Sequence, residues 1–203
     1  MNLTCENLKV NVPEGIKGKW AVEKFEVKPD SLRRLHYAFE GRPVDPGIYT
    51  RLKRIGGIDP MMSDTPAEIR DCMDFMYKAA GNVLVNGLGL GMVIKGLSSK
   101  DEVTHIDIVE IEQDIIDLVW PTYKDDPKLT LYHADAFTVE WEKGKKWDCA
   151  WHDIWPEICT DNLSEIAILK RKYARKVGFQ EAWVEDLLRR IRRRDSRNSW
   201  WGS

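Results

Sequence analysis

The stretch "GNVLVNGLGLGMVIKGL", from Gly81 to Leu97, sets three glycines at alternate positions between an apolar run and a run that looks helical. Glycine weakens both strands and helices. Gly87, Gly89 and Gly91 therefore mark a backbone with unusual dihedral angles, or one that another group approaches closely. A strand, a glycine loop and a helix in this order make a nucleotide-binding turn.

The glycine spacing by itself leaves two interpretations open. A dinucleotide-binding fingerprint would have its third glycine at position 92, where this chain has Met92. The pattern therefore departs from that of NAD-binding proteins, and the same spacing also occurs in plain tight turns. Residues farther along the chain have to decide between a binding loop and a turn.

After the glycine loop the sequence alternates between strand and helix patterns. Apolar runs predict strands at 83–85 and 103–111, in "LTLYHADAF" and in "WDCAWHDIW", while "EQDIIDLVWP" predicts a helix that Pro121 ends. Alternation of this kind predicts a mostly parallel sheet with helices on both faces. We therefore expect a Rossmann-like α/β fold for the central part of the chain.

Three segments of different composition are expected. Residues 1–62 are rich in turn signals and short alternating runs, which predicts a small β-hairpin unit. Residues 63–160 are expected to form the Rossmann-like core, which opens with a capped helix in "SDTPAEIRDCMDFMYKAAG". Residues 161–203 are expected to form a basic helical extension, helical to about Arg194, with two apolar stripes. The stripes are Ile166, Leu169, Tyr173 and Val177, and then Trp183, Leu187, Leu188 and Ile191.

Composition argues against several classes of protein. The 203 residues carry a net charge of −2, although residues 161–203 hold 11 Lys and Arg against 6 Asp and Glu. No apolar stretch approaches the length of a membrane span, no signal-peptide pattern opens the sequence, and the histidines are too scattered to predict a metal site. The four cysteines form no CxxC pair, which is typical of reduced thiols. We accordingly expect a cytoplasmic protein with no metal and no membrane partner.

Three acidic residues stand at the ends of predicted strands. Glu110 lies nineteen residues after Gly91, where a carboxylate can accept both hydroxyls of a ribose or simply be solvated. Asp135 closes the third strand and can accept an adenine amino proton or cap a loop. Asp153 ends the fourth strand. Because the carboxyl ends of parallel strands share one edge of a sheet, all three are predicted to face one crevice.

In this order the motifs resemble class I S-adenosylmethionine-dependent methyltransferases, in their spermidine-synthase-like branch. The resemblance covers residues 60–155 and rests on "VLVNGLGLG", "IVEIE", "ADAF" and "WDCAWHD". It implies that the cofactor is S-adenosylmethionine or a related adenosyl compound. By this resemblance the glycines lie against the amino-acid part of the cofactor, Glu110 holds the ribose and Asp135 the adenine edge. The cofactor-binding residues so implied are Gly87, Gly89, Gly91, Glu110, Ile111, Asp135 and Ala136.

The chain also departs from that branch. Aminopropyltransferases carry a D-x-x-D-P pattern, in which Asp153 matches the first acid, but Pro156 occupies the second position and Glu157 comes one place late. A polyamine needs several carboxylates to balance its charges, so polyamine synthesis is put in doubt. The antiparallel strand pair that usually ends methyltransferase sheets is expected to be missing, because little β-patterned sequence follows Ile158.

Methyl transfer from a sulfonium needs mainly alignment of the nucleophile and exclusion of water. Asp153 is our candidate catalytic residue, which aligns the nucleophile or accepts its proton. His152 points to the opposite face of the strand and is expected to pack between sheet and helix. Trp155 either walls an acceptor site or packs in the core. Asp64 and Glu68 either reach the crevice and contact the acceptor substrate, or serve as an N-cap and a solvated helix residue.

The basic runs "LKRKYARK" and "RRIRRR" also allow two interpretations. We favour packing of the apolar stripes on the core or on a second copy of the chain, which would make a homo-oligomer. A surface that contacts nucleic-acid phosphates is the alternative. For the whole protein we expect S-adenosylmethionine-dependent methyl transfer to an acceptor that the sequence does not identify. Aminopropyl transfer, and a non-catalytic nucleoside-binding protein with a nucleic-acid or protein partner, are the alternatives.

Overall fold

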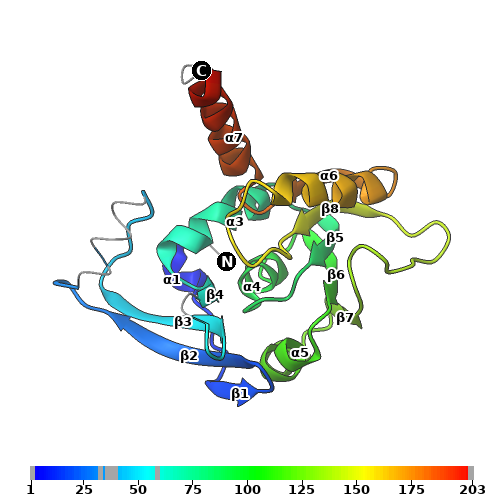
Figure 1. The fold of residues 1–203 in the computed structure, drawn as a ribbon. Coiled ribbons are helices and arrows are strands. Elements are labelled where there is room, and N and C mark those ends of the chain that lie inside the picture. The colour runs from blue at the N-terminus through cyan, green and yellow to red at the C-terminus, as the bar shows by residue number, and fades with distance from the viewer. Residues whose placement is uncertain (1–2, 32–33, 35–40, 58–59, 201–203) are drawn as a thin grey trace.

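A computed structural model describes residues 3–31, 34, 41–57 and 60–200 of the chain, with side chains placed up to residue 197 in the last helix. The N-terminal part forms a four-stranded antiparallel sheet in the order β1-β2-β3-β4. Its strands are β1 (Gly15–Lys17), β2 (Trp20–Val27), β3 (Gly47–Arg54) and β4 (Pro60–Ser63), and the short helix α1 (Cys5–Leu8) precedes them. In Figure 1 this sheet lies beside the rest of the fold, in blue and cyan.

The central sheet has five strands in the order β7-β6-β5-β8-β9, and every neighbouring pair is parallel. These strands are β5 (Gly81–Asn86), β6 (Val103–Glu110), β7 (Leu129–His133), β8 (Trp147–His152) and β9 (Val177–Ala182). The chain builds outward from β5 to β7 and then returns to place β8 on the other side of β5. Ligands of such sheets bind at this reversal, outside the carboxyl ends of the strands. The predicted Rossmann-like α/β fold is confirmed.

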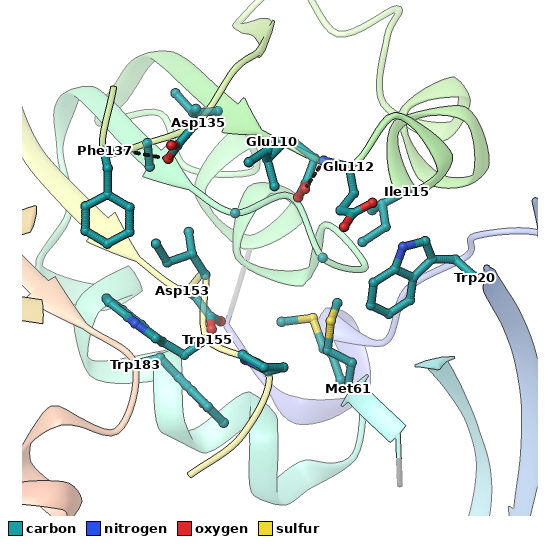
Figure 2. Close-up of a pocket in the computed structure, with 18 of the residues that line it drawn as sticks. Trp20, Met61, Glu110, Glu112, Ile115, Asp135, Phe137, Asp153, Trp155 and Trp183 are labelled. Carbon is teal, nitrogen blue, oxygen red and sulfur yellow. Dashed lines mark hydrogen bonds between the residues drawn. The ribbon is translucent and has the colours of Figure 1, made fainter. Parts of the chain in front are cut away.

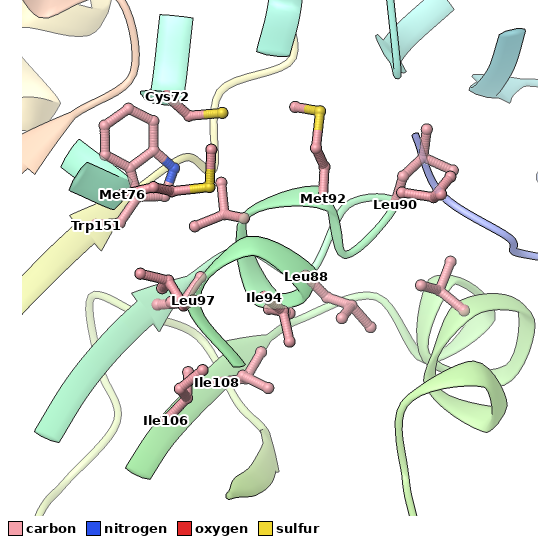
Figure 3. Close-up of a cluster of buried hydrophobic side chains, with 14 of the residues drawn as sticks. Cys72, Met76, Leu88, Leu90, Met92, Ile94, Leu97, Ile106, Ile108 and Trp151 are labelled. Carbon is pink, nitrogen blue, oxygen red and sulfur yellow. The ribbon is translucent and has the colours of Figure 1, made fainter. Parts of the chain in front are cut away.

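Helices cover both faces of the parallel sheet, as the alternating pattern predicts. They are α3 (Pro66–Lys78), α4 (Met92–Ser98), α5 (Gln113–Val119) and α6 (Asn162–Tyr173), with a 3-10 turn, η1 (Trp120–Thr122), after α5. A further helix, α7 (Glu185–Trp200), follows β9. Successive strand residues point to opposite faces. Val83 and Val85 accordingly pack with Ile94 of α4, whereas Leu84 packs with Leu169 of α6. Figure 3 shows the α4 side of this core, where Ile106 and Ile108 of β6 lie beneath the helix.

One predicted element is wrong. The chain from Asp161 is not helical throughout, because Val177–Ala182 forms β9 and pairs in register with β8 from Trp147 to His152. Helix α6 ends at Tyr173, and the Lys176 amide closes a turn onto the Tyr173 carbonyl at 2.8 Å. The predicted stripe therefore divides: Ile166, Leu169 and Tyr173 are buried in α6, while Val177 starts a strand. Its sequence "VGFQEA" lies at the sheet edge and is only partly buried, so it has no strong apolar pattern.

The last helix leaves the body of the protein. Leu188 of α7 is buried, Leu187 and Ile191 are partly exposed, and the polar side chains from 192 to 197 are exposed. Figure 1 shows α7, in red, standing away from both sheets. Within the described residues, the chain passes from β9 into α7 without a further strand. No helix in the described ranges is both long enough and apolar enough to span a bilayer.

Candidate functional site

A cavity of about 440 Å³ lies at the carboxyl ends of the parallel strands. Its walls come from the loops after β5, β6, β7, β8 and β9, from Glu68 of α3 and from the N-terminal sheet with Trp20, Arg54, Met61 and Met62. Figure 2 shows these side chains converging from both sheets. The cavity has the size and the position at the strand reversal that small-molecule sites of α/β proteins have.

The glycine loop forms part of the cavity floor, and each of its positions is glycine for a different structural reason. Gly87 has φ +101°, and a Cβ on it would collide with the carbonyl oxygen of Asp153. Gly89 has φ +51°, and its Cβ would lie 2.6 Å from the sulfur of Met62. Both glycines line the cavity. Gly91 is instead the N-cap of α4, and a Cβ there would collide with the ring of Tyr123. Gly91 is not among the lining residues, so packing accounts for it.

Glu110 ends β6 beneath the cavity and is 7% exposed. Its Oε2 accepts the Leu88 amide at 2.9 Å, and its Oε1 accepts the Glu112 amide at 2.8 Å. Burial raises the pKa of Glu110, and these amide bonds act against the rise. The two carboxylate oxygens can together accept about four hydrogen bonds, so the carboxylate keeps a position for a ligand hydroxyl beside its backbone amide donors. The neighbouring Ile111 is largely exposed and also lines the cavity.

Asp135 and Ala136 line the cavity on the loop after β7. Oδ1 of Asp135 accepts the Phe137 amide at 2.8 Å, so Asp135 caps this loop while it faces the cavity. Lys172 of α6 holds the same loop: its Nζ donates to the carbonyl oxygens of Ala136, Phe137 and Val139 at 3.1, 2.9 and 2.7 Å. The hydroxyl of Tyr173 donates to Ala136 as well, at 3.1 Å. The sequence pattern treated Lys172 as part of a basic run, and only the fold shows this contact.

Asp153 and Glu68 bring two carboxyl groups to the same cavity. Burial, reinforced by the Glu68 charge, raises the pKa of Asp153 to about 8. Burial also raises the pKa of Glu68, to about 7, although Ser63 donates to it from its amide at 2.7 Å and from its hydroxyl at 2.6 Å. Asp71 adds negative charge behind the pair, and it forms a two-point ion pair with Arg42. At neutral pH the pair therefore holds a proton for part of the time.

Asp64 lies elsewhere. It is 1% exposed, and its carboxylate accepts the Val10 amide at 3.0 Å and the Thr50 amide at 2.6 Å. These bonds join the segment before β1 to β3 and β4. Asp64 is not among the residues that line the cavity, and its contacts are those of a structural residue.

His152 is fully buried in a chain of side-chain hydrogen bonds between the sheet and α6. Its Nδ1 lies 2.7 Å from Nδ2 of Asn86, and its Nε2 lies 3.0 Å from Oε1 of Gln180. Nε2 of Gln180 donates onward to the Lys170 carbonyl at 2.9 Å. Because Asn86 donates to Nδ1, the hydrogen-bond chain places the ring proton of His152 on Nε2. Burial lowers the pKa of His152 to about 4. His152 is therefore a neutral packed residue, as the strand alternation predicts.

Aromatic side chains close the cavity around Asp153. Trp155 is 6% exposed, lines the cavity, and donates from Nε1 to Glu165 at 2.8 Å. Figure 2 places Trp155 and Trp183 on the Asp153 side and Trp20 on the opposite side. Trp183, Phe137, Trp20 and Met61 were not predicted. They come from turns and from a second sheet, and the nine tryptophans of the sequence pointed at most to Trp183 and Trp20.

The acidic side chains make no metal centre. Among the residues that the structure describes, no group of three or more His, Cys, Asp or Glu side chains is arranged to hold a metal ion.

Comparison with known proteins shows a distant similarity to class I S-adenosylmethionine-dependent methyltransferases. The N-methyltransferase NodS from Bradyrhizobium japonicum is 10% identical with a TM-score of 0.41, over 53% of this chain and 61% of that chain. The CcbJ methyltransferase from Streptomyces caelestis is 17% identical with a TM-score of 0.43, over 54% and 46%. CalS10, an amino pentose methyltransferase from Micromonospora echinaspora, is 15% identical with a TM-score of 0.40, over 58% and 49%.

The matched region spans about half the length of these solved structures. No protein-family model matches the chain, and no curated protein matches it. The similarity is one of fold, and it carries no conclusion about activity.

Proposed function

We propose that the cavity binds S-adenosylmethionine and that the protein transfers its methyl group to an acceptor. The observation that carries this proposal is the convergence of Gly87, Glu110 and Asp135, from three successive parallel strands, on one cavity at the strand reversal. The residues fit an adenosyl ligand, because the floor is bare backbone at Gly87 and Gly89 and the Glu110 carboxylate keeps an acceptor position.

Each lining residue has a role in this proposal. Gly87 and Gly89 lie against the amino-acid part of the ligand. Glu110 accepts the ribose hydroxyls beside Ile111, and the free oxygen of Asp135 accepts the adenine amino group next to Ala136. Six acids and a single Arg, Arg54, are found among the described lining residues, which favours a ligand with positive charge.

The chain's own contribution to the reaction is alignment, proton removal and exclusion of water. When bound, S-adenosylmethionine supplies an electrophilic methyl group and a neutral leaving sulfur. Asp153 and Glu68 face the acceptor side, where Asp153 takes the proton of the nucleophile. Its pKa of about 8 suits a base that works near neutral pH. Trp155 and Trp183 keep solvent from the reacting atoms.

Aminopropyl transfer to an amine is the second candidate. The observation in its favour is the position of Glu68, which brings a second carboxyl group into the cavity with Asp153. The sequence directly after Asp153 lacks the second acid of the D-x-x-D-P pattern. The two carboxyl groups of Asp153 and Glu68 would hold the acceptor amine by charge. They would hold an amine that receives a methyl group in the same way.

Calorimetry separates these proposals. We expect S-adenosylmethionine and its demethylated product, S-adenosylhomocysteine, to bind in the micromolar range. Tighter binding of the decarboxylated compound would favour aminopropyl transfer. Failure of all three to bind would refute the proposed function.

A further inference from the structure

The second helix after the site, α7, carries an unusual concentration of one charged residue. Its sequence "EDLLRRIRRRDSRNSW" holds six arginines and no lysine. Arginine presents a planar fork of donors that matches the oxygens of a phosphate, whereas lysine presents a compact point charge. A helix that only needed a solvated surface would have no reason to use arginine alone.

Three of these arginines share one face of the helix. Arg190, Arg193 and Arg197 follow the spacing i, i+3, i+7, which puts their side chains in one row about 10 Å long. All three are exposed. Among the described residues, the ion pairs of α7 join Glu185 to Lys170 and Arg189, and Arg194 to Asp195, so no acidic side chain forms an ion pair with this row.

The arginine row lies on a part of α7 that does not pack against either sheet (Figure 1). Leu188 anchors the start of α7, but beyond Ile191 the helix stands away from both sheets (Figure 1). Like charges at positions i, i+3 and i, i+4 destabilise a helix, and a short helix without packing is only marginally stable in water. An anionic partner laid along the row would remove this repulsion and complete the helix.

We propose that the Arg190, Arg193 and Arg197 row of α7 docks on the phosphate backbone of a nucleic acid. A row of about 10 Å matches about three phosphates of one strand. An anionic membrane surface fits less well, because the apolar residues Leu187 and Ile191 lie near the base of the helix. Among the side chains described, up to residue 197, no matching apolar face continues along the row. The contacts reach phosphates alone, so the binding is independent of base sequence. This inference goes beyond methyl transfer and does not depend on it.

Fluorescence anisotropy with a labelled DNA duplex of about 24 base pairs, and with an RNA strand of similar length, tests the proposal. The triple variant Arg190→Gln, Arg193→Gln, Arg197→Gln keeps good helix formers in place. The matched control changes three exposed arginines elsewhere, Arg70→Gln, Arg171→Gln and Arg175→Gln. A third protein with Arg190→Lys, Arg193→Lys and Arg197→Lys keeps the charge and loses the fork.

We expect the wild type to bind with affinity that falls about 20- to 50-fold between 50 and 200 mM salt, as about three phosphate contacts require. The glutamine variant should lose at least tenfold in affinity and most of the salt dependence, the lysine variant should lose less, and S-adenosylhomocysteine binding should not change. The control variant should bind nucleic acid normally. Absence of binding at 50 mM salt, an equal loss in the control variant, or equal binding to polyglutamate or to phosphatidylserine vesicles would overturn the proposal.

Discussion

Gly87 lies directly against the backbone carbonyl of Asp153, so close that a Cβ at position 87 would collide with that oxygen. The two residues directly follow the neighbouring parallel strands β5 and β8, at the reversal of the sheet. The Asp153 amide also donates to the Asn86 carbonyl at 2.8 Å, which fixes the two strand ends to each other. These two contacts therefore fix the start of the glycine loop relative to Asp153.

We predict that Gly87→Ala moves the Asp153 segment. The new Cβ must displace that backbone, and φ +101° is also strained for alanine. A loss of about 2–4 kcal/mol in unfolding free energy is expected, because close packing and backbone strain both oppose the change. Urea denaturation measures it, and Gly144→Ala, at φ +91° with open space around its Cβ, is the control for strain alone. Equal losses in the two variants would show that the contact with Asp153 contributes nothing.

Glu110→Gln should weaken S-adenosylhomocysteine binding by about 2 kcal/mol, or roughly thirtyfold. One oxygen and the negative charge that accepts ribose hydroxyls are lost, while the shape is kept. Isothermal calorimetry gives the affinity. Glu140→Gln, an exposed acid after β7, is the matched control and should bind like the wild type. Normal binding by the Glu110 variant would remove the ribose assignment.

The stability of the protein should fall as pH rises from 6 to 9. Because the pKa of Asp153 is raised to about 8 and that of Glu68 to about 7, the folded state holds protons that the unfolded state has released. Asp153 and Glu68 also face other titratable and charged groups, namely Asp71 with its partner Arg42 and the buried Cys72 thiol. These groups are not changed in the Asp153→Asn variant. Asp153→Asn should lose less stability over this range, by at least about 1 kcal/mol. Thermal unfolding at pH 6, 7.5 and 9 measures the difference, and parallel curves for the two proteins would contradict the assignment.

Lys172→Met should loosen the loop after β7. Three carbonyl oxygens lose their donor, while the methionine keeps most of the apolar volume of the lysine stem. We expect a stability loss of about 1–3 kcal/mol and faster amide hydrogen exchange in residues 136–139. Lys176→Met is the control, a lysine just beyond α6 whose side chain makes no such contacts within the described part of the chain. Unchanged exchange in the loop would show that Lys172 does not hold it.

The centre of the parallel sheet was predictable because β5, β6 and β8 are largely buried on both faces and carry apolar runs. Strand β9 was not predictable, since an edge strand that is only partly buried has little pattern, and the basic residues around it suggested a helix. Among the site residues, Glu110, Asp135 and Asp153 could be predicted because strand ends meet at one edge. Glu68 could not be separated from Asp64 by sequence, because the choice depends on how the N-terminal sheet packs around the two acids. The Val10 and Thr50 amides hold Asp64 away from the cavity, whereas Glu68 lines it.

The walls around the glycine loop come from almost the whole length of the chain, between Trp20 of the first sheet and Trp183 after the last strand. Contacts between residues so far apart close large loops, and such contacts form slowly during folding. During synthesis the pocket is therefore complete only when the chain up to Trp183 has left the ribosome. Nascent chains that end before β9 should not be retained on immobilised S-adenosylhomocysteine, whereas finished chains should be. Ligand binding would then distinguish finished molecules from truncated ones.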